Sequence, residues 1–425
     1  MTEQQSPPLS VPFGEARRRH RPRGRLRAAA GMLAPVARTA GRVALERDAG
    51  QRLRRLREAA ADRLRERLRP SRPKMRALVA GFGGRLAWRS IPAPSGPGPQ
   101  GAVVHPIAVA TCDLDRALVL GKTPFMLPLC FGHECVAEVL TVGEQVSSVR
   151  PGQRVVVPFQ ISCGTCAACT IGHTGNCTGV PPISMYSFGL GGGHWGGALS
   201  DQLAVPFADA MLVALPNGID PVAAASVADN VADGYRHVAP HLPGLLQRDP
   251  DAQVRIVVSP EKRSPFSASV ALYAGLIALA LGARHVELID ARPWVRAHAE
   301  RLGLDALTPA DGRRHRPAPL VVDAGASGRS LNAALKATQP VCTSAGMLHR
   351  NARIPVALMY GRNATLHIGR THARAVIPGV LELIAAGRLH PEEVTTNVAD
   401  LDDAPRALTE HVRSDATKTI LAHPH

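Results

Sequence analysis

The chain has 425 residues, 45% of them hydrophobic, and a formal net charge of +16. This length suits two ordinary domains with full cores, and no apolar run reaches the eighteen or so residues that a membrane helix needs. The N-terminus lacks the apolar core of a secretory signal, and eight cysteines in so long a chain are more typical of thiols and metal ligands than of a disulfide framework. We therefore expect a cytoplasmic protein.

The positive charge is concentrated at the N-terminus. Residues 1–73 contain 19 Arg, no Lys and 7 acidic residues, a formal charge of +12, whereas the rest of the chain carries +4. Any electrostatic partner, such as a nucleic acid or an anionic lipid, would therefore contact this arm.

Residues 1–40 are rich in Arg, Ala and Pro and are predicted to be disordered. A basic amphipathic helix is predicted over residues 42–69. Its apolar positions recur at spacings of three and four, at Leu53, Leu56, Ala60, Leu64 and Leu68. Such a helix binds nucleic acid, lipid or a partner helix, but the alternative that residues 1–74 lie outside the functional protein is equally open.

Residues 75–225 predict a β-rich domain. The runs GAVVHPIAVAT, CVAEVLTVG and RVVVPFQ are short, rich in Val and bounded by Gly and Pro. From residue 230 to 360, apolar strands alternate with helical patterns: VRIVVS, ASVALYAGLIALALG, HVELID, PWVRAHAERLG and PLVVDAG. This alternation is typical of a doubly wound parallel sheet. A helix over residues 375–386 and the closing segment TKTILAH follow.

Half of the cysteines lie in the stretch SCGTCAACTIGHTGNC. Cys163, Cys166, Cys169 and Cys177 have the spacing C-x2-C-x2-C-x7-C, with glycines between them. Close pairs on a turning loop let four sulfurs converge on one tetrahedral zinc ion, and four protein ligands leave no open position. The spacing therefore predicts a structural zinc site, in preference to two disulfides.

This stretch resembles the structural-zinc lobe of the zinc-dependent medium-chain alcohol dehydrogenases. The segments GHECVAEVLTVGEQVSSVRPGQRVVV and GGALSDQLAVPFADAMLVALPNGID are also similar to that family, particularly to its formaldehyde and threonine dehydrogenase branches. The resemblance implies an α/β fold: a GroES-like catalytic domain over residues 75–229 and a Rossmann-like coenzyme domain over 230–360. A C-terminal segment, 361–425, would return to the catalytic domain, and residues 1–74 would form an Arg-rich extension.

The resemblance also implies a second, catalytic zinc. Its ligands would be Cys112, His133 and Asp229, with a fourth position for water or substrate. Taken singly, each has an alternative interpretation: Cys112 as a buried core thiol, His133 as a hydrogen-bonded core histidine and Asp229 as a helix cap. Asp233 is the reserve candidate for the third ligand.

Other residues around this site are assigned by the same resemblance. Asp115 fits a carboxylate that orients the ligand imidazole, and Glu134 is a group that approaches the metal during ligand exchange or forms a salt bridge. The remaining thiols, Cys130, Cys135 and Cys342, are expected to be structural.

The coenzyme loop departs from the family pattern. After the strand that ends at Val258 the chain reads SPEKRSPFSASVALYAG, without the glycines that let the backbone approach a pyrophosphate. Lys262 and Arg263 could bind phosphate through their side chains instead. Asp290 either binds the coenzyme ribose, which favours NAD over NADP, or caps the next helix.

Two further departures lie beside Cys112. Asp113 puts a negative charge where some relatives place a basic pyrophosphate ligand. Leu114 replaces the hydroxyl that relays the proton of an alcohol in many relatives, so either another group or water carries the proton or alcohol oxidation is not the reaction.

The leading interpretation is a two-zinc oxidoreductase that transfers hydride between a small alcohol or aldehyde and NAD(P), acting as a homodimer or homotetramer. The alternative is a zinc-stabilised binding or regulatory module that has lost dinucleotide binding.

Overall fold

The computed structural model describes residues 57, 73–81, 84–120, 127–188, 195–346 and 352–423. The chain divides into two units, residues 1–54 and 55–425, and every described residue belongs to the second. The predicted disorder of residues 1–40 lies outside the described residues, as does the predicted helix over 42–69 apart from Arg57.

A small antiparallel sheet begins the described fold. Its strands lie in the order β2–β1–β4, with β1 at Lys74–Ala80, β2 at Leu86–Pro92 and β4 at Leu129–Cys130. The register pairs Met75 with Ile91 and Val79 with Cys130. Met75 is therefore already inside a strand that starts one residue earlier.

The larger β-sheet is built mainly of antiparallel pairs, in the order β15–β16–β3–β5–β6–β8, with β7 beside β3. The strands are β3 Ala102–Ala110, β5 Glu134–Val142, β6 Arg154–Val157, β7 Leu203–Val205, β8 Val213–Ala214, β15 Asn397–Asp400 and β16 Thr419–Ala422. The three predicted strand runs form β3, β5 and β6. The closing segment forms β16, which pairs with β3 through Ile420 and Ala110.

The third sheet is parallel throughout, in the order β11–β10–β9–β12–β13–β14. Its strands are β9 Val254–Val257, β10 Val286–Ile289, β11 Asp305–Leu307, β12 Ala318–Asp323, β13 Thr338–Ser344 and β14 Thr365–Ile368. This is the strand order of a Rossmann sheet, with its switch point between β9 and β12. The predicted fold class, a GroES-like β-rich part with a Rossmann-type sheet, is confirmed.

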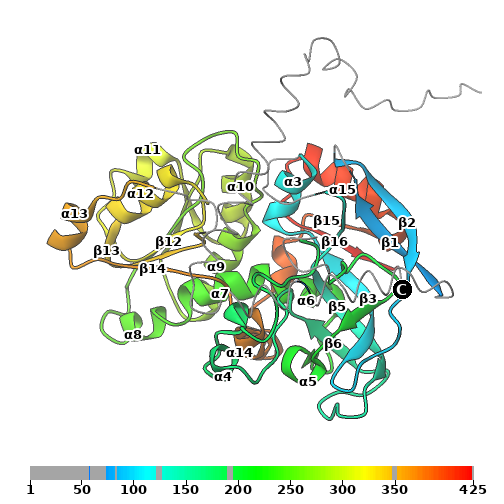
Figure 1. Ribbon diagram of the computed structural model, residues 1–425. Coiled ribbons are helices and arrows are strands. Elements are labelled where there is room, and N and C mark those ends of the chain that lie inside the picture. Colours follow the sequence, from blue (N-terminus) through cyan, green and yellow to red (C-terminus); the bar gives the residue numbers. More distant parts are fainter. Residues whose placement is uncertain are drawn as a thin grey trace, which may run out of the picture. The chain divides into compact units, whose positions relative to one another are not determined.

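The helices connect these strands (Figure 1). The α-helices are α3 Asp113–Val119, α4 Ala167–Thr170, α5 Ala208–Met211, α6 Pro221–Ala224, α7 Asn230–Val238, α8 Leu242–Leu246, α9 Ser269–Ala280, α10 Pro293–Arg301, α11 Pro309–Gly312, α12 Gly328–Lys336, α13 Val356–Gly361, α14 Ala373–Ala385 and α15 Ala404–Arg413. Short 3-10 turns are η3 Thr174–Asn176, η5 Ala225–Ala228, η6 Pro391–Val394 and η7 Leu401–Asp403. Among the described residues, no helix is long and apolar enough to cross a membrane.

One hydrophobic core joins the antiparallel and the parallel sheets. Val136 of β5 and Val156 of β6 belong to the same buried cluster as Ile256 of β9 and Leu272 of α9. Helix α7 packs against α9 so closely that a Cβ on Gly234 would lie 2.9 Å from the backbone nitrogen of Ala274. This contact packs the middle of α7 against the middle of α9, and the first residues of the two helices are joined by the hydrogen bond from Ser269 Oγ to Asn230 Oδ1 at 2.9 Å.

Candidate active site

The four-cysteine segment folds into a compact lobe around α4 and η3. The Sγ atoms of Cys163, Cys166, Cys169 and Cys177 all lie within 4.8 Å of one another. Cys166 Sγ and Cys177 Sγ are 3.9 Å apart, close to the sulfur separation of about 3.8 Å that tetrahedral Zn–S bonds of about 2.3 Å give. All four are free thiols, which excludes the disulfide alternative in this structure.

The backbone of the lobe is shaped for sulfur ligands. The N–H groups of Cys163 and Gly179 donate to Cys177 Sγ, each at 3.3 Å, and such bonds stabilise a thiolate. A Cβ at Gly179 would lie 2.4 Å from Cys163 Sγ, so only glycine fits there. Burial opposes ionisation of Cys166, but hydrogen bonds from Thr178 and the backbone outweigh it and lower the thiol pKa to about 5.

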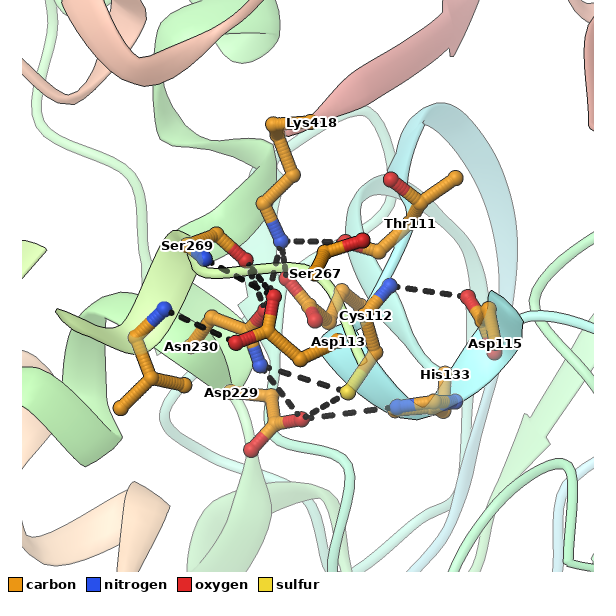
Figure 2. A network of polar contacts seen from close by, with 12 residues as sticks. Thr111, Cys112, Asp113, Asp115, His133, Asp229, Asn230, Ser267, Ser269 and Lys418 are labelled. Atoms are coloured by element: carbon orange, nitrogen blue, oxygen red, sulfur yellow. Dashed lines mark hydrogen bonds and ion pairs between the residues drawn. The ribbon is translucent and has the colours of Figure 1, made fainter. Parts of the chain in front are cut away.

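A second cluster forms where three elements begin. Cys112 is the N-cap of α3, His133 directly precedes β5, and Asp229 is the N-cap of α7. The Oδ2 atom of Asp229 lies 3.3 Å from Cys112 Sγ and 3.4 Å from His133 Nε2 (Figure 2). The three side chains named as catalytic zinc ligands thus meet, although they lie up to 117 residues apart in the chain.

The donor set fits a zinc ion. His133 is 3% exposed, and apart from the 3.4 Å ion-pair contact of Nε2 with Asp229 its ring nitrogens have no partner within the described residues. An unpartnered buried imidazole is costly unless it binds a cation or a proton donor. A thiolate, an imidazole and a carboxylate are the ligand types that zinc prefers.

Local charge also favours a cation. Burial is the main cause that raises the pKa of the Cys112 thiol well above its usual range, and the neighbouring Asp229 and Glu134 raise it further. Without a metal the thiol therefore keeps its proton, which it donates to Asp229. A divalent ion would reverse this balance, because metal binding to cysteine releases the proton.

A buried lysine, which the sequence analysis missed, lies behind these ligands. Lys418, at 0% exposure, precedes β16 and donates to Glu134 Oε2 at 3.0 Å, to Asn230 Oδ1 at 2.8 Å and to the Thr111 carbonyl. Asn230 in turn donates to Cys112 Sγ at 3.3 Å. Glu134 therefore forms a salt bridge, one of its two expected roles, and its other oxygen has no hydrogen-bond partner in the described parts of the chain.

The two remaining acids take different places. Asp115 accepts from the Cys112 N–H at 2.8 Å, and no bond joins it to the imidazole of His133, although Asp115 Oδ1 and His133 Nδ1 are both buried without a described partner. Asp233 instead pairs with Arg236 at 2.5 Å and with Thr371. It is not among the residues that converge with Cys112, so the geometry favours Asp229 over this reserve candidate.

The coenzyme loop carries its predicted basic residues on the surface. Lys262 and Arg263 are exposed, and Glu261 pairs with Arg329 at 2.6 Å. Asp290, in contrast, is fully buried. Its carboxylate accepts from Arg292 Nη2 at 2.7 Å and from the Arg292 backbone N–H at 2.7 Å. The Asp290 side chain is therefore paired with Arg292, and the N-cap of α10 is Arg292 itself, without a side-chain cap bond.

Helix α9 begins at Ser269, close to the predicted start near Ala268. Its first two N–H groups donate to the carboxylate of Asp113, from Ser269 at 2.9 Å and from Val270 at 3.2 Å. Elsewhere in the parallel-sheet part, a cavity of about 630 Å³ is lined by the last residues of β9 and β10 and by residues of α11 and α12. Its basic lining residues are Arg313, His315, Arg329, Lys336 and Arg353.

Comparison with known proteins identifies the relatives of this fold. Residues 98–217 match the model of the alcohol dehydrogenase GroES-like domain. A probable zinc-binding alcohol dehydrogenase of Mycobacterium tuberculosis is 30% identical over 78% of this chain and 84% of its own length. The chain belongs to the zinc-dependent medium-chain alcohol dehydrogenase family.

Solved structures share this fold. An alcohol dehydrogenase from Thermus sp. ATN1 superimposes with a TM-score of 0.74 at 29% identity, over 82% of this chain and all of the other. An alcohol dehydrogenase of Escherichia coli CFT073, solved with NADH, has a TM-score of 0.66 at 19% identity, over 82% of this chain and 99% of its own. The family resemblance read from the sequence is confirmed, and the protein is an oxidoreductase that acts on small molecules.

Proposed function

We propose that the protein is a zinc-dependent alcohol dehydrogenase that transfers hydride between a small alcohol or aldehyde and NAD(P), with Cys112, His133 and Asp229 as its catalytic zinc ligands. The observation that carries the proposal is the convergence of these three buried side chains in a member of this family. A zinc ion held there would act as a Lewis acid on the substrate oxygen.

The residues around the ligands would hold them in place. Asn230 donates to both Cys112 Sγ and Asp229 Oδ2, at 3.3 and 3.1 Å, which orients the thiolate and the carboxylate. Lys418 binds Glu134 Oε2 at 3.0 Å, and the Glu134 carboxylate also lies within 4.8 Å of the ligand atoms of the other three residues. Phe159 and Phe188 flank the His133 ring, with centroids 6.0 and 5.1 Å away, and restrict the access of water on that side.

The proton of an alcohol must leave by a different route from that of many relatives. Leu114 packs against the hydrophobic core and has no group that donates or accepts a proton. Water or another side chain would have to carry the proton to solvent.

NAD(P) as hydride acceptor is supported by the family and by the NADH in a structure of the same fold. The basic cavity at the strand ends also supports it, since open α/β sheets bind ligands there. The start of α9, however, does not fit a pyrophosphate while Asp113 holds its N–H groups. With Asp290 bound to Arg292, the expected preference for NAD over NADP loses its basis.

We propose a separate, structural role for zinc in the cysteine lobe, where four thiol ligands leave no open position. The predicted domain limits, the homo-oligomeric state and the cytoplasmic location stay predictions.

The proposal is tested by turnover. The purified protein, loaded with zinc, would be mixed with a series of primary and secondary alcohols or aldehydes and with NAD(H) or NADP(H), and the nicotinamide absorbance followed. We expect a rate with at least one pair that is abolished in Asp229→Ala and retained in Asp233→Asn. A zinc-loaded wild type that turns over none of the pairs would contradict the proposed function.

A further inference from the structure

The anion-binding end of α9 is already bound by a carboxylate of the same chain. Asp113 accepts from Ser269 N–H at 2.9 Å, from Val270 N–H at 3.2 Å and from the Ser269 hydroxyl (Figure 2). These are the unpaired donors at the start of a helix of 12 residues, where the helix dipole also favours negative charge.

In a Rossmann fold this position normally receives the pyrophosphate of the dinucleotide. A carboxylate and a phosphate bind to the same features of a protein, namely N–H donors and a positive electrostatic potential. In this chain both requirements are met internally, because Lys418 lies close by and binds Asn230, whose Oδ1 is 2.9 Å from Ser269 Oγ.

The loop in front of α9 is fixed in the same arrangement. Arg292 donates from Nη1 to the Phe266 carbonyl at 2.8 Å while its Nη2 binds Asp290. Ser267 N–H contacts the Asp113 carbonyl at 3.4 Å, so the loop is held to the Asp113 backbone as well. A glycine-free loop pinned at these points has little freedom to open a second phosphate position.

We propose that Asp113 is an internal competitor for the phosphates of the coenzyme and thereby sets coenzyme affinity. The inference rests on the proposed function, since it concerns how NAD(P)(H) enters that site. A dinucleotide places its pyrophosphate at α9 only when the Asp113 carboxylate leaves Ser269 and Val270. Since Asp113 directly follows Cys112, this contact also ties the loop of a zinc ligand to the coenzyme helix.

The experiment is a fluorescence titration with NADH of the full-length zinc-loaded protein and two variants, Asp113→Asn and Asp113→Ala. Removing the competing charge should lower the Kd for NADH by about tenfold or more, as expected for a charge at a helix N-terminus. Glu261→Gln removes the same charge from the exposed loop without touching α9, and should change the Kd by less than about threefold. Zinc content is measured for every variant.

Thermal unfolding distinguishes the loss of the Asp113 carboxylate at the start of α9 from a general destabilisation of the variant. Without coenzyme, Asp113→Ala should melt at a lower temperature than the wild type, because α9 loses the group that satisfies its first donors. Saturating NADH should raise the melting temperature of Asp113→Ala by more than it raises that of the wild type. Both Asp113 variants are informative, since Asp113→Asn keeps the shape of the side chain.

An unchanged or weaker NADH affinity in both zinc-loaded Asp113 variants would overturn the proposal, and so would absence of NADH binding in all the proteins. The turnover assay of the wild type is read independently. Wild-type turnover with unchanged variant affinity rejects only the role of Asp113, whereas absence of turnover rejects the proposed function.

Discussion

Lys418 is the residue on which the polar network behind the zinc ligands depends. Burial opposes its charged form, but Glu134 and the other acidic and polar neighbours outweigh burial and raise its pKa. The amine is therefore charged at neutral pH, and its positive charge acts on the buried carboxyl groups of Glu134 and Asp113.

We expect Lys418→Met to lower the free energy of unfolding by about 3–5 kcal/mol, because it leaves Glu134 buried without its partner. Denaturation by urea of wild type and variant measures this. Lys418→Arg keeps the charge and should cost less. A loss below about 1 kcal/mol in Lys418→Met would mean that the pair contributes little to folding.

At the residue scale, the sequence was sufficient to predict those site residues that lie in short recognisable motifs. Cys112, His133 and Asp229 were found through the resemblance to a family, and the structure brings them together. Lys418 and Asn230 were not found, because the bonds of Asn230 to Cys112 and of Lys418 to Thr111 join residues 118 and 307 positions apart, and no local pattern marks a buried lysine. The bond of Asp290 to Arg292 was missed for a different reason, since the spacing of two residues is compatible with many side-chain directions.

Among the elements, the cysteine lobe has the most direct test. Cys169→Ser should lower the melting temperature and remove one zinc ion, since structural zinc contributes folding free energy, about 10–16 kcal/mol of apparent binding in small zinc peptides. Part of that value is expected here, because the lobe is one piece of a larger fold. Metal analysis and thermal unfolding measure the two effects.

The matched control is Cys342→Ser, a buried cysteine of β13 outside both metal clusters. It should keep both zinc ions. A Cys169→Ser protein with unchanged melting temperature and zinc content would show that the lobe does not hold a structural metal.

Periodicity and apolar runs located the main elements to within a few residues. The apolar runs became β9, β10 and β12, and the helix predicted over 375–386 spans Ala373–Ala385. Short elements such as β11 and α11 were not predicted, because three or four residues carry too little periodicity and owe their form to tertiary packing. The occupation of the α9 start by Asp113 also required the structure, because it joins two segments distant in the chain.

For the whole molecule, buried histidines make stability depend on pH. Burial, with help from Lys418, lowers the pKa of His411 to about 3, while its ring is held between Ser267 and Thr419. In the unfolded chain His411 binds a proton near pH 6.5, whereas in the folded chain it stays neutral until the pH is much lower. Stability is therefore full above about pH 6.5 and falls as the pH drops toward 3.

We expect this one group to cost up to about 1.4 kcal/mol per pH unit in that window. The free energy of unfolding, measured by urea denaturation, should differ less between pH 7 and pH 5 in His411→Gln than in the wild type. His285→Gln, at an exposed position, controls for the loss of a histidine. Equal pH dependence in His411→Gln and wild type would rule out this origin of acid instability.

The extension is tested by a shortened protein that begins at Met75. Residues 1–73 carry most of the net charge, and the cut removes only the first residue of β1, which pairs with Pro92. We expect the shortened protein to fold, bind zinc and keep the activity of the full chain. Insolubility or lost activity, with the full chain intact, would give the extension a role in the function.

Zinc content tests the central claim most directly. Elemental analysis of the wild type should find two zinc ions per chain, and Cys112→Ala should keep one, that of the cysteine lobe, because Cys112 Sγ is one of the three buried ligands that meet at Asp229. A wild type with a single zinc ion, retained in Cys112→Ala, would contradict the catalytic site described here.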